Sequence, residues 1–215
     1  MAGLAASGLF ERLSFAWQRR GNGRRLEGRY APQAEILGAM AGKNIAIVGN
    51  ARALSKSQQG AQIDRADLVV RINRAPMPST ASHGSRTDWL ALATGLPDQE
   101  RARIAPGRLL WMSHKRKRLR AWMAASAGFY LHPLADYRAL AQSIGAPPTT
   151  GAMLIDLAAK SQAQSIALYG FDFFASLSLS GSRTAAQTPH DFSAEAAWAN
   201  TLIAADPRLT LHTME

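Results

Sequence analysis

From Lys43 onward, short apolar segments alternate with stretches that have helical spacing. The segment NIAIVG at 44–49 predicts a buried strand, because it is short, apolar and rich in β-branched residues. Further strands are predicted at 66–73, within 87–94, and at 108–113, 128–132, 165–170 and 209–212. Helices are predicted at 114–127, 135–144, 150–164 and 192–205. Short apolar strands separated by helices favour an α/β fold, with a mostly parallel sheet covered by helices on both faces.

The first 30 residues differ from the rest of the chain. A short amphipathic helix is indicated by the apolar residues Leu4, Leu9, Phe10, Leu13, Phe15 and Trp17, and an Arg/Gly-rich stretch follows at 19–29. The charge follows the apolar part, so this is not a secretory signal. A basic amphipathic segment can lie on an anionic membrane, and it can equally pack on the main domain. We expect residues 1–30 to form this segment and residues 31–215 to form a single domain.

The amino-acid composition limits the cellular compartments and the classes of partner that fit this protein. The 215 residues contain no cysteine, which excludes disulfides and thiolate zinc sites and fits a reducing compartment such as a bacterial cytoplasm. No apolar run approaches the roughly 18 residues that a membrane span needs. The net charge of +10 is concentrated in arginines 19–29 and in the basic run 115–120. Such an excess indicates an anionic partner, which could be nucleic acid, a membrane surface or a phosphorylated ligand. The alternative is that the protein surface is simply basic.

Candidate ligand contacts follow two predicted strands. Gly49 and Asn50 end the first strand, and a glycine there lets a ligand approach the backbone. Arg71 and Asn73 lie at the end of the second strand, in DRADLVVRINRAP. In parallel sheets, ligands bind beyond the carboxyl ends of the strands. The alternatives are an ordinary turn and a polar strand end. The first motif is neither a dinucleotide fingerprint nor a P-loop, because the required glycines and Gly-Lys pair are missing.

Two helix starts carry further candidate chemistry. In PPTTGAML, Thr149 or Thr150 can cap a helix whose free N–H groups would attract an anion such as phosphate. The alternative is an N-cap that binds no ligand. In PHDFSAEAAW, His190 precedes a helix that contains Glu195, and histidine is the side chain best suited to take a proton near neutral pH. A cap or surface histidine is the alternative. No pattern of metal ligands and no G-x-S-x-G elbow occurs, so we expect neither a metal nor a serine hydrolase.

Taken in order, these stretches resemble glycosyltransferase family 29, the sialyltransferases. Residues 45–89 resemble the long sialyl motif, residues 147–171 resemble the short motif, and His190 with Glu195 resembles the very short motif H-x4-E. The resemblance implies a GT-A-like variant of the Rossmann sheet and an inverting, metal-independent enzyme without a cofactor. The implied substrates are a CMP-sugar donor and a glycan acceptor. His190 would be the catalytic base, with Glu195 beside it. The donor contacts would be Gly49, Asn50, Arg71, Asn73, Thr149, Thr150, Gly151 and Tyr169.

The chain departs from the family pattern at several positions. The paired cysteines of the family are replaced by Ile45 and Ala163, so apolar packing must substitute for their disulfide. No histidine occurs at 171–189 to serve the phosphate, a role left open or filled by Arg183, His83 or His132. These departures and the absent stem indicate a short bacterial, cytoplasmic relative that contacts the inner membrane peripherally, with a lipopolysaccharide or capsule acceptor as one hypothesis.

The sequence leaves the donor sugar open. CMP activates sialic acid but also Kdo and related ulosonic acids, and the motifs indicate the nucleotide better than the sugar. The alternatives are a catalytically inactive module that binds CMP or another nucleotide and, through the run 115–120, a nucleic-acid-binding protein. Nucleic acid is not expected, because aromatic residues at base-stacking spacing are missing from that run.

Overall fold

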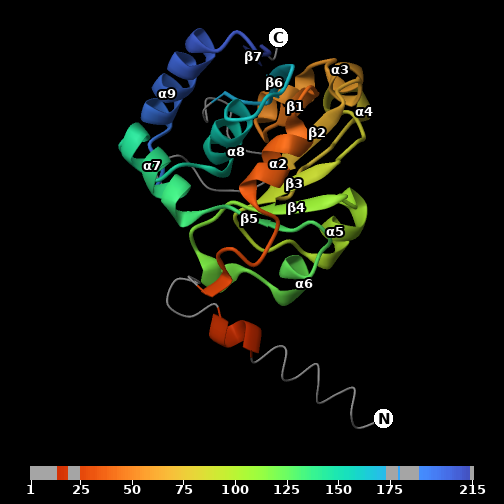
Figure 1. Ribbon diagram of the computed structural model, residues 1–215. Coiled ribbons are helices and arrows are strands. Elements are labelled where there is room, and N and C mark those ends of the chain that lie inside the picture. Colours follow the sequence, from red (N-terminus) through yellow and green to blue (C-terminus); the bar gives the residue numbers. More distant parts are fainter. Residues whose placement is uncertain (1–13, 19–24, 173–178, 180–188, 214–215) are drawn as a thin grey trace.

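The protein is built around a single parallel sheet (Figure 1). The structure is a computed structural model, and it describes residues 14–18, 25–172, 179 and 189–213. Its seven strands are β1 Asn44–Val48, β2 Leu68–Ile72, β3 Trp89–Leu92, β4 Arg108–Trp111, β5 Tyr130–Leu131, β6 Ser165–Tyr169 and β7 Leu209–Leu211. They are arranged in the order β5-β4-β3-β2-β1-β6-β7, and each neighbouring pair is parallel. The predicted α/β class and all seven predicted strands are confirmed. The order reverses between β1 and β6, which makes the carboxyl ends of these two strands a topological switch point.

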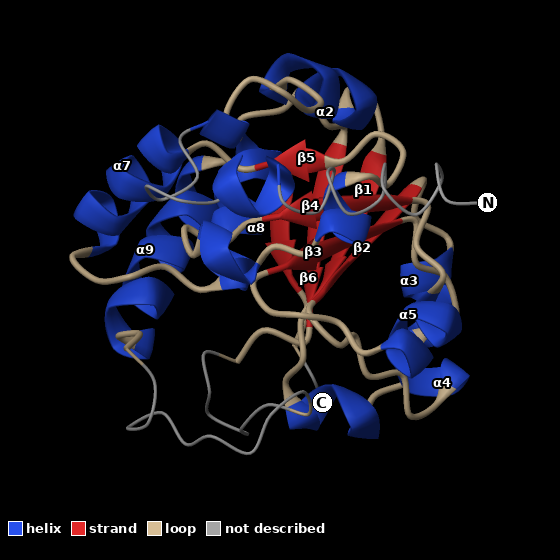
Figure 2. Cartoon of the chain, turned by 90° about the horizontal axis from the view of Figure 1, so that it is seen from below, coloured by secondary structure: helices blue, strands red, loops and turns tan. Residues whose placement is uncertain are grey.

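Alternation along the strands places the core on both faces of the sheet. In β1, Ile45 and Ile47 belong to the cluster under one helical layer, whereas Ala46 and Val48 belong to the cluster under the other. Figure 2 shows α2, α7, α8 and α9 on one side of the strands and α3, α4 and α5 on the other. Ala163, the position that replaces the second family cysteine, lies 4% exposed in the same cluster as Ile45. The expected apolar substitute for the disulfide is therefore present.

The helices agree only partly with the sequence prediction. They are α2 Gln33–Met40, η2 Arg52–Lys56, α3 Gly60–Asp64, α4 Thr80–His83, α5 Asp98–Ile104, η3 Arg116–Arg118, α6 Ala121–Ala124, α7 Leu134–Ile144, α8 Thr150–Ala159 and α9 Phe192–Ala205. The predictions for α7 and α9 are confirmed, and α8 ends five residues earlier than expected. The continuous helix predicted at 114–127 is wrong: η3 and α6 occupy it. Here the buried Arg116 donates to the carbonyls of Ser113 and His132, which fixes the chain as a tight turn after β4.

The beginning of the chain contacts the body of the protein at Leu26. This side chain is fully buried in the second hydrophobic cluster, and Phe15, from the helical stretch 14–18, packs against the same cluster. Trp17 is 53% exposed and lies under the guanidinium of Arg25. The other residues of the predicted amphipathic segment lie outside the described ones, and the division at residue 30 stays a prediction. Among the described helices, none is long and apolar enough to cross a membrane.

Candidate active site

The switch point is formed by two glycines in direct backbone contact. Gly49 follows β1 and donates its N–H to the carbonyl of Tyr169 at 2.7 Å. A Cβ at Gly49 would come within 2.3 Å of the carbonyl oxygen of Gly170, so no other residue fits without moving the backbone. The close approach of β1 and β6 directs the next residue, Asn50, along the carboxyl edge of the sheet toward β2.

Asn50 and Asn73 both lie at this edge. Asn50 is 9% exposed and donates from Nδ2 to the carbonyl of Ile72 at 3.1 Å. Asn73 has a φ of 53°, a left-handed conformation that asparagine tolerates better than most residues. Its Oδ1 accepts from the N–H of Ala93, and its Nδ2 lies 3.4 Å from Oγ1 of Thr150. The structure therefore brings together the two asparagines and the start of α8, which are about 100 residues apart in the sequence.

The N-terminus of α8 is capped and closely packed. Thr149 is the N-cap, and its Oγ1 accepts from the N–H of Ala152 at 3.1 Å. A Cβ at Gly151 would lie 2.7 Å from the ring of Phe171, so the glycine allows this ring to lie against the first turn. The first-turn N–H groups carry the partial positive charge of a helix N-terminus, which favours an anion such as phosphate.

His190 is oriented by a backbone carbonyl. Its Nδ1 lies 2.7 Å from the carbonyl oxygen of Pro147. A carbonyl can only accept, so Nδ1 carries the proton, and Nε2 of the neutral ring keeps its lone pair. The half-buried imidazole is thus in the tautomer that can act as a base at Nε2.

Glu195 is turned toward the same loop. Its two carboxylate oxygens accept from the N–H of Thr149 at 2.9 Å and from Oγ1 of Thr149 at 2.6 Å. Burial raises the pKa of Glu195, and these two bonds act in the opposite direction. The spacing of the H-x4-E pair has a physical reason: His190 holds Pro147, and Glu195 holds Thr149 two residues later. Glu195 is therefore a positioning residue for the start of α8.

The structure does not bring Arg71 and Tyr169 to this group through their side chains. Arg71 points to the same face of the sheet as Val69, where its guanidinium donates to the carbonyls of His83 and Arg86. Burial lowers the pKa of Arg71 to about 10. The Tyr169 ring is 2% exposed and stacks on His212 at 4.3 Å, so only its carbonyl meets Gly49.

Two of the three expected substitutes for the phosphate-binding histidine, His83 and His132, are buried away from the site, and burial lowers the pKa of each to about 4. Arg183 lies outside the described residues. His114 was missed by the sequence reasoning, although it follows the fourth strand. The centre of its ring lies 4.4 Å from that of Tyr137. Burial lowers the pKa of His114, and the charges of Lys115, Arg116, Arg118 and His190 lower it further.

Comparison with known proteins finds a matching family model for part of the chain. Residues 32–125 match the model of glycosyltransferase family 29 (sialyltransferase). The matched region spans less than half of the chain. It includes Gly49, Asn50, Arg71 and Asn73, whereas the start of α8 and the H-x4-E pair lie beyond it. No curated protein matches the chain.

Solved sialyltransferases share the fold. A mammalian sialyltransferase in complex with Gal-beta-1-3GalNAc-ortho-nitrophenol superposes with a TM-score of 0.60 at 17% identity, covering 96% of this chain and 85% of that chain. CstII from Campylobacter jejuni, in complex with the substrate analogue CMP-3FNeuAc, superposes with a TM-score of 0.51 at 13% identity, covering 79% of each chain. CstII with cytidine-5'-monophosphate gives 0.54 at 13% identity and 80% of each chain. The expected Rossmann-like architecture is confirmed.

Proposed function

We propose that the protein is an inverting glycosyltransferase that moves a sialic acid or a related ulosonic acid, such as Kdo, from a CMP-sugar to a glycan acceptor. One observation carries the proposal: the proton of His190 is held on Nδ1 by the Pro147 carbonyl, which leaves Nε2 as a base beside the start of α8. The family match and the sialyltransferase fold support the reaction class.

The nucleotide would bind along the carboxyl edge from β1 to β2. Asn50 and Asn73 offer amide groups there, and the first turn of α8 offers N–H groups to the phosphate. The CMP and CMP-3FNeuAc complexes of CstII, which has this fold, support a CMP donor.

In the proposed reaction, Nε2 of His190 takes the proton of an acceptor hydroxyl. The acceptor oxygen forms a bond to the anomeric carbon as the bond from that carbon to the CMP phosphate oxygen breaks, so the configuration inverts and CMP leaves. A base in this position contributes about 10²–10⁴-fold in rate. The helix N-terminus would stabilise the negative charge on departing CMP, which is why we propose a reaction without a metal or cofactor.

Nucleotide binding is tested first by thermal unfolding with CMP, CDP, UDP and NAD, each with and without EDTA. CMP at 100 times its Kd should stabilise the fold by about 2.7 kcal/mol, and EDTA should not change this. Stabilisation by UDP or NAD but not by CMP would contradict the proposed donor, and loss of the CMP effect in EDTA would contradict metal independence.

Catalysis is tested with His190→Ala. This variant should bind CMP like the wild type but release CMP from CMP-Neu5Ac or CMP-Kdo about 10²–10⁴-fold more slowly. His212→Ala is the matched control, because His212 is partly buried against Tyr169 and distant in sequence from the H-x4-E pair. Wild-type turnover in His190→Ala would remove His190 from the role of base. CMP binding with no turnover by the wild type across an acceptor panel would favour the inactive nucleotide-binding module.

We also propose peripheral contact with an anionic inner membrane in a bacterial cytoplasm. The exposed Trp17 beside Arg25 supports this, because such pairs suit a membrane interface. Flotation of the full chain should occur with phosphatidylglycerol vesicles, weaken in Trp17→Ala and be absent with phosphatidylcholine vesicles. Equal flotation of both forms would count against a role for this residue.

A further inference from the structure

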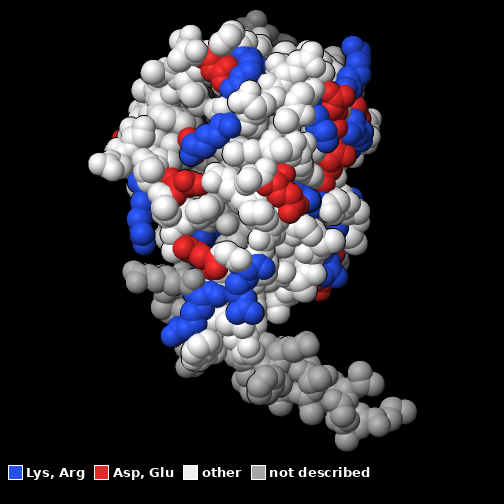
Figure 3. Space-filling view, in the orientation of Figure 1, with Lys and Arg blue, Asp and Glu red and all other residues white. Residues whose placement is uncertain are grey.

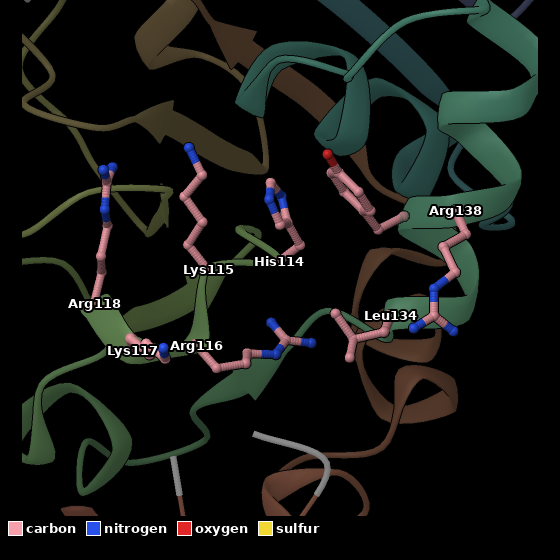
Figure 4. A pocket seen from close by; sticks show the side chains of 8 residues that line it. His114, Lys115, Arg116, Lys117, Arg118, Leu134 and Arg138 are labelled. Atoms are coloured by element: carbon pink, nitrogen blue, oxygen red, sulfur yellow. The ribbon is translucent and has the colours of Figure 1, made fainter. Parts of the chain in front are cut away.

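A basic pocket of about 500 Å³ lies beyond His114, outside the proposed nucleotide edge (Figure 4). Its lining comes from two segments, residues 114–118 after β4 and the beginning of α7 with Leu134, Tyr137 and Arg138. Figure 4 shows His114, Lys115 and Arg118 extending from the first segment in similar directions.

Several cations of this pocket lack an acidic partner within the described residues. Lys115, Arg118 and Arg138 are exposed, and no ion pair joins them to a carboxylate of the described chain. Other arginines of the protein do have such partners, among them Arg108 with Glu35 at 2.9 Å and Arg208 with Asp206 at 2.6 Å. On the face drawn in Figure 3, blue and red side chains lie close together in several places. An uncompensated cluster in a concave site favours an anionic ligand.

The pocket is built on a fixed base. Arg116 is 1% exposed, and its guanidinium donates to the carbonyls of Ser113 and His132. These bonds tie the segment 113–118 to the end of β5. The ring contact between His114 and Tyr137 joins the same segment to α7. The cations are therefore presented from an ordered turn.

The position of the pocket indicates which substrate it meets. β4 is three strands from β1, about 14 Å at the usual spacing, and its carboxyl end is at the same edge of the sheet. The proposed donor contacts are on β1, β2 and α8. His190 lies close enough to His114 to influence its pKa. A group in the pocket would thus lie on the β4 side of the sheet edge, away from the proposed donor contacts, as expected for a part of the acceptor.

We propose that this pocket binds an anionic group, a carboxylate or a phosphate, carried by the acceptor sugar. The inference rests on the proposed function and specifies its acceptor: a glycan that is already negatively charged. Lys115 and Arg118, which extend in similar directions from the first lining segment (Figure 4), would donate to the anion, and Arg138 of the second segment would add to the positive potential.

The test measures binding of three matched sugars by NMR titration of the full chain: galactose, galacturonate and galactose 6-phosphate. At least one anionic sugar should bind about tenfold more tightly than galactose, since one charge-assisted hydrogen bond contributes about that factor. The tighter of the two identifies carboxylate or phosphate as the group recognised. Equal binding of all three sugars would overturn the proposal.

A double variant and a matched control locate the binding. Lys115→Ala/Arg118→Ala should weaken binding of the anionic sugar by about tenfold or more and leave binding of galactose unchanged. Lys43→Ala/Arg65→Ala removes the same charge at the amino ends of β1 and β2 and should bind like the wild type. Equal weakening in both double variants would show unspecific attraction and overturn the proposal.

CMP binding is measured separately by thermal shift, so the two proposals can fail independently. If CMP does not stabilise the wild type, the proposed donor is wrong whatever the sugars do. If Lys115→Ala/Arg118→Ala loses CMP binding as strongly as sugar binding, the pocket serves the donor and the acceptor assignment fails.

Discussion

Replacing Glu195 by alanine tests whether α9 holds the start of α8. The carboxylate is 6% exposed and accepts two bonds from Thr149, at 2.9 Å from N–H and at 2.6 Å from Oγ1. In Glu195→Ala the partly buried Thr149 N–H would lose its acceptor, and the loop that His190 also contacts would lose its attachment to Glu195.

The magnitude follows from two opposing effects. Hydrogen bonds to a charged group contribute about 1.5–3 kcal/mol each, so the two bonds together give about 3–6 kcal/mol. Burial of the carboxylate opposes this stabilisation, and burial is also what raises the pKa of Glu195. We expect a net loss of about 3 kcal/mol in the free energy of unfolding, at the lower end of that range.

Urea unfolding at pH 7 provides the measurement, with the midpoint falling at unchanged m-value. Glu195→Gln is the matched variant: its amide can accept from the Thr149 N–H and donate to Oγ1, so we expect a loss of only about 1 kcal/mol. Glu35→Ala removes an exposed partner of Arg108 and should cost at most about 1 kcal/mol. A free energy of unfolding of Glu195→Ala within about 0.5 kcal/mol of the wild-type value would contradict the positioning role of Glu195. A loss in Glu195→Gln as large as that in Glu195→Ala would contradict it too.

Three further predictions concern packing and pH. Gly49→Ala should destabilise the protein by about 3 kcal/mol, because the new Cβ would meet the Gly170 carbonyl oxygen. Gly38→Ala should stabilise it by about 0.5–1 kcal/mol, because a Cβ at this helical position meets open space. Thermal unfolding of the two variants measures both effects. The pKa of His132 falls from 6.5 to about 4 on folding, so the stability that this residue contributes is complete above pH 6.5 and should drop by about 2 kcal/mol at pH 5; comparing unfolding at the two pH values, His132→Gln should remove this part of the drop. Leu26→Ala should cost about 2–5 kcal/mol in urea unfolding, and a loss below 1 kcal/mol would show that residues before 31 do not stabilise the domain.

Sequence alone determined the positions of the seven strands and the starts of the helices α7, α8 and α9. Strand positions could be predicted because buried strands are short, apolar and β-branched, and the helix starts at Thr150 and Phe192 because Thr149 and Asp191 are local capping residues. The asparagines after β1 and β2 could be predicted as neighbours because parallel strands end at one edge. The prediction at 114–127 failed because a buried arginine bonded to carbonyls has no local signature.

Only the tertiary structure decided how these elements meet. That His190 donates to Pro147, 43 residues away, and that Glu195 holds Thr149, 46 residues away, depends on α9 packing beside α7 and α8. The same packing turns residues 114–118 and α7 into one pocket. Local sequence specifies the backbone conformation of each segment, whereas contacts across the sheet depend on strand order and helix packing, which arise from burial of the whole core.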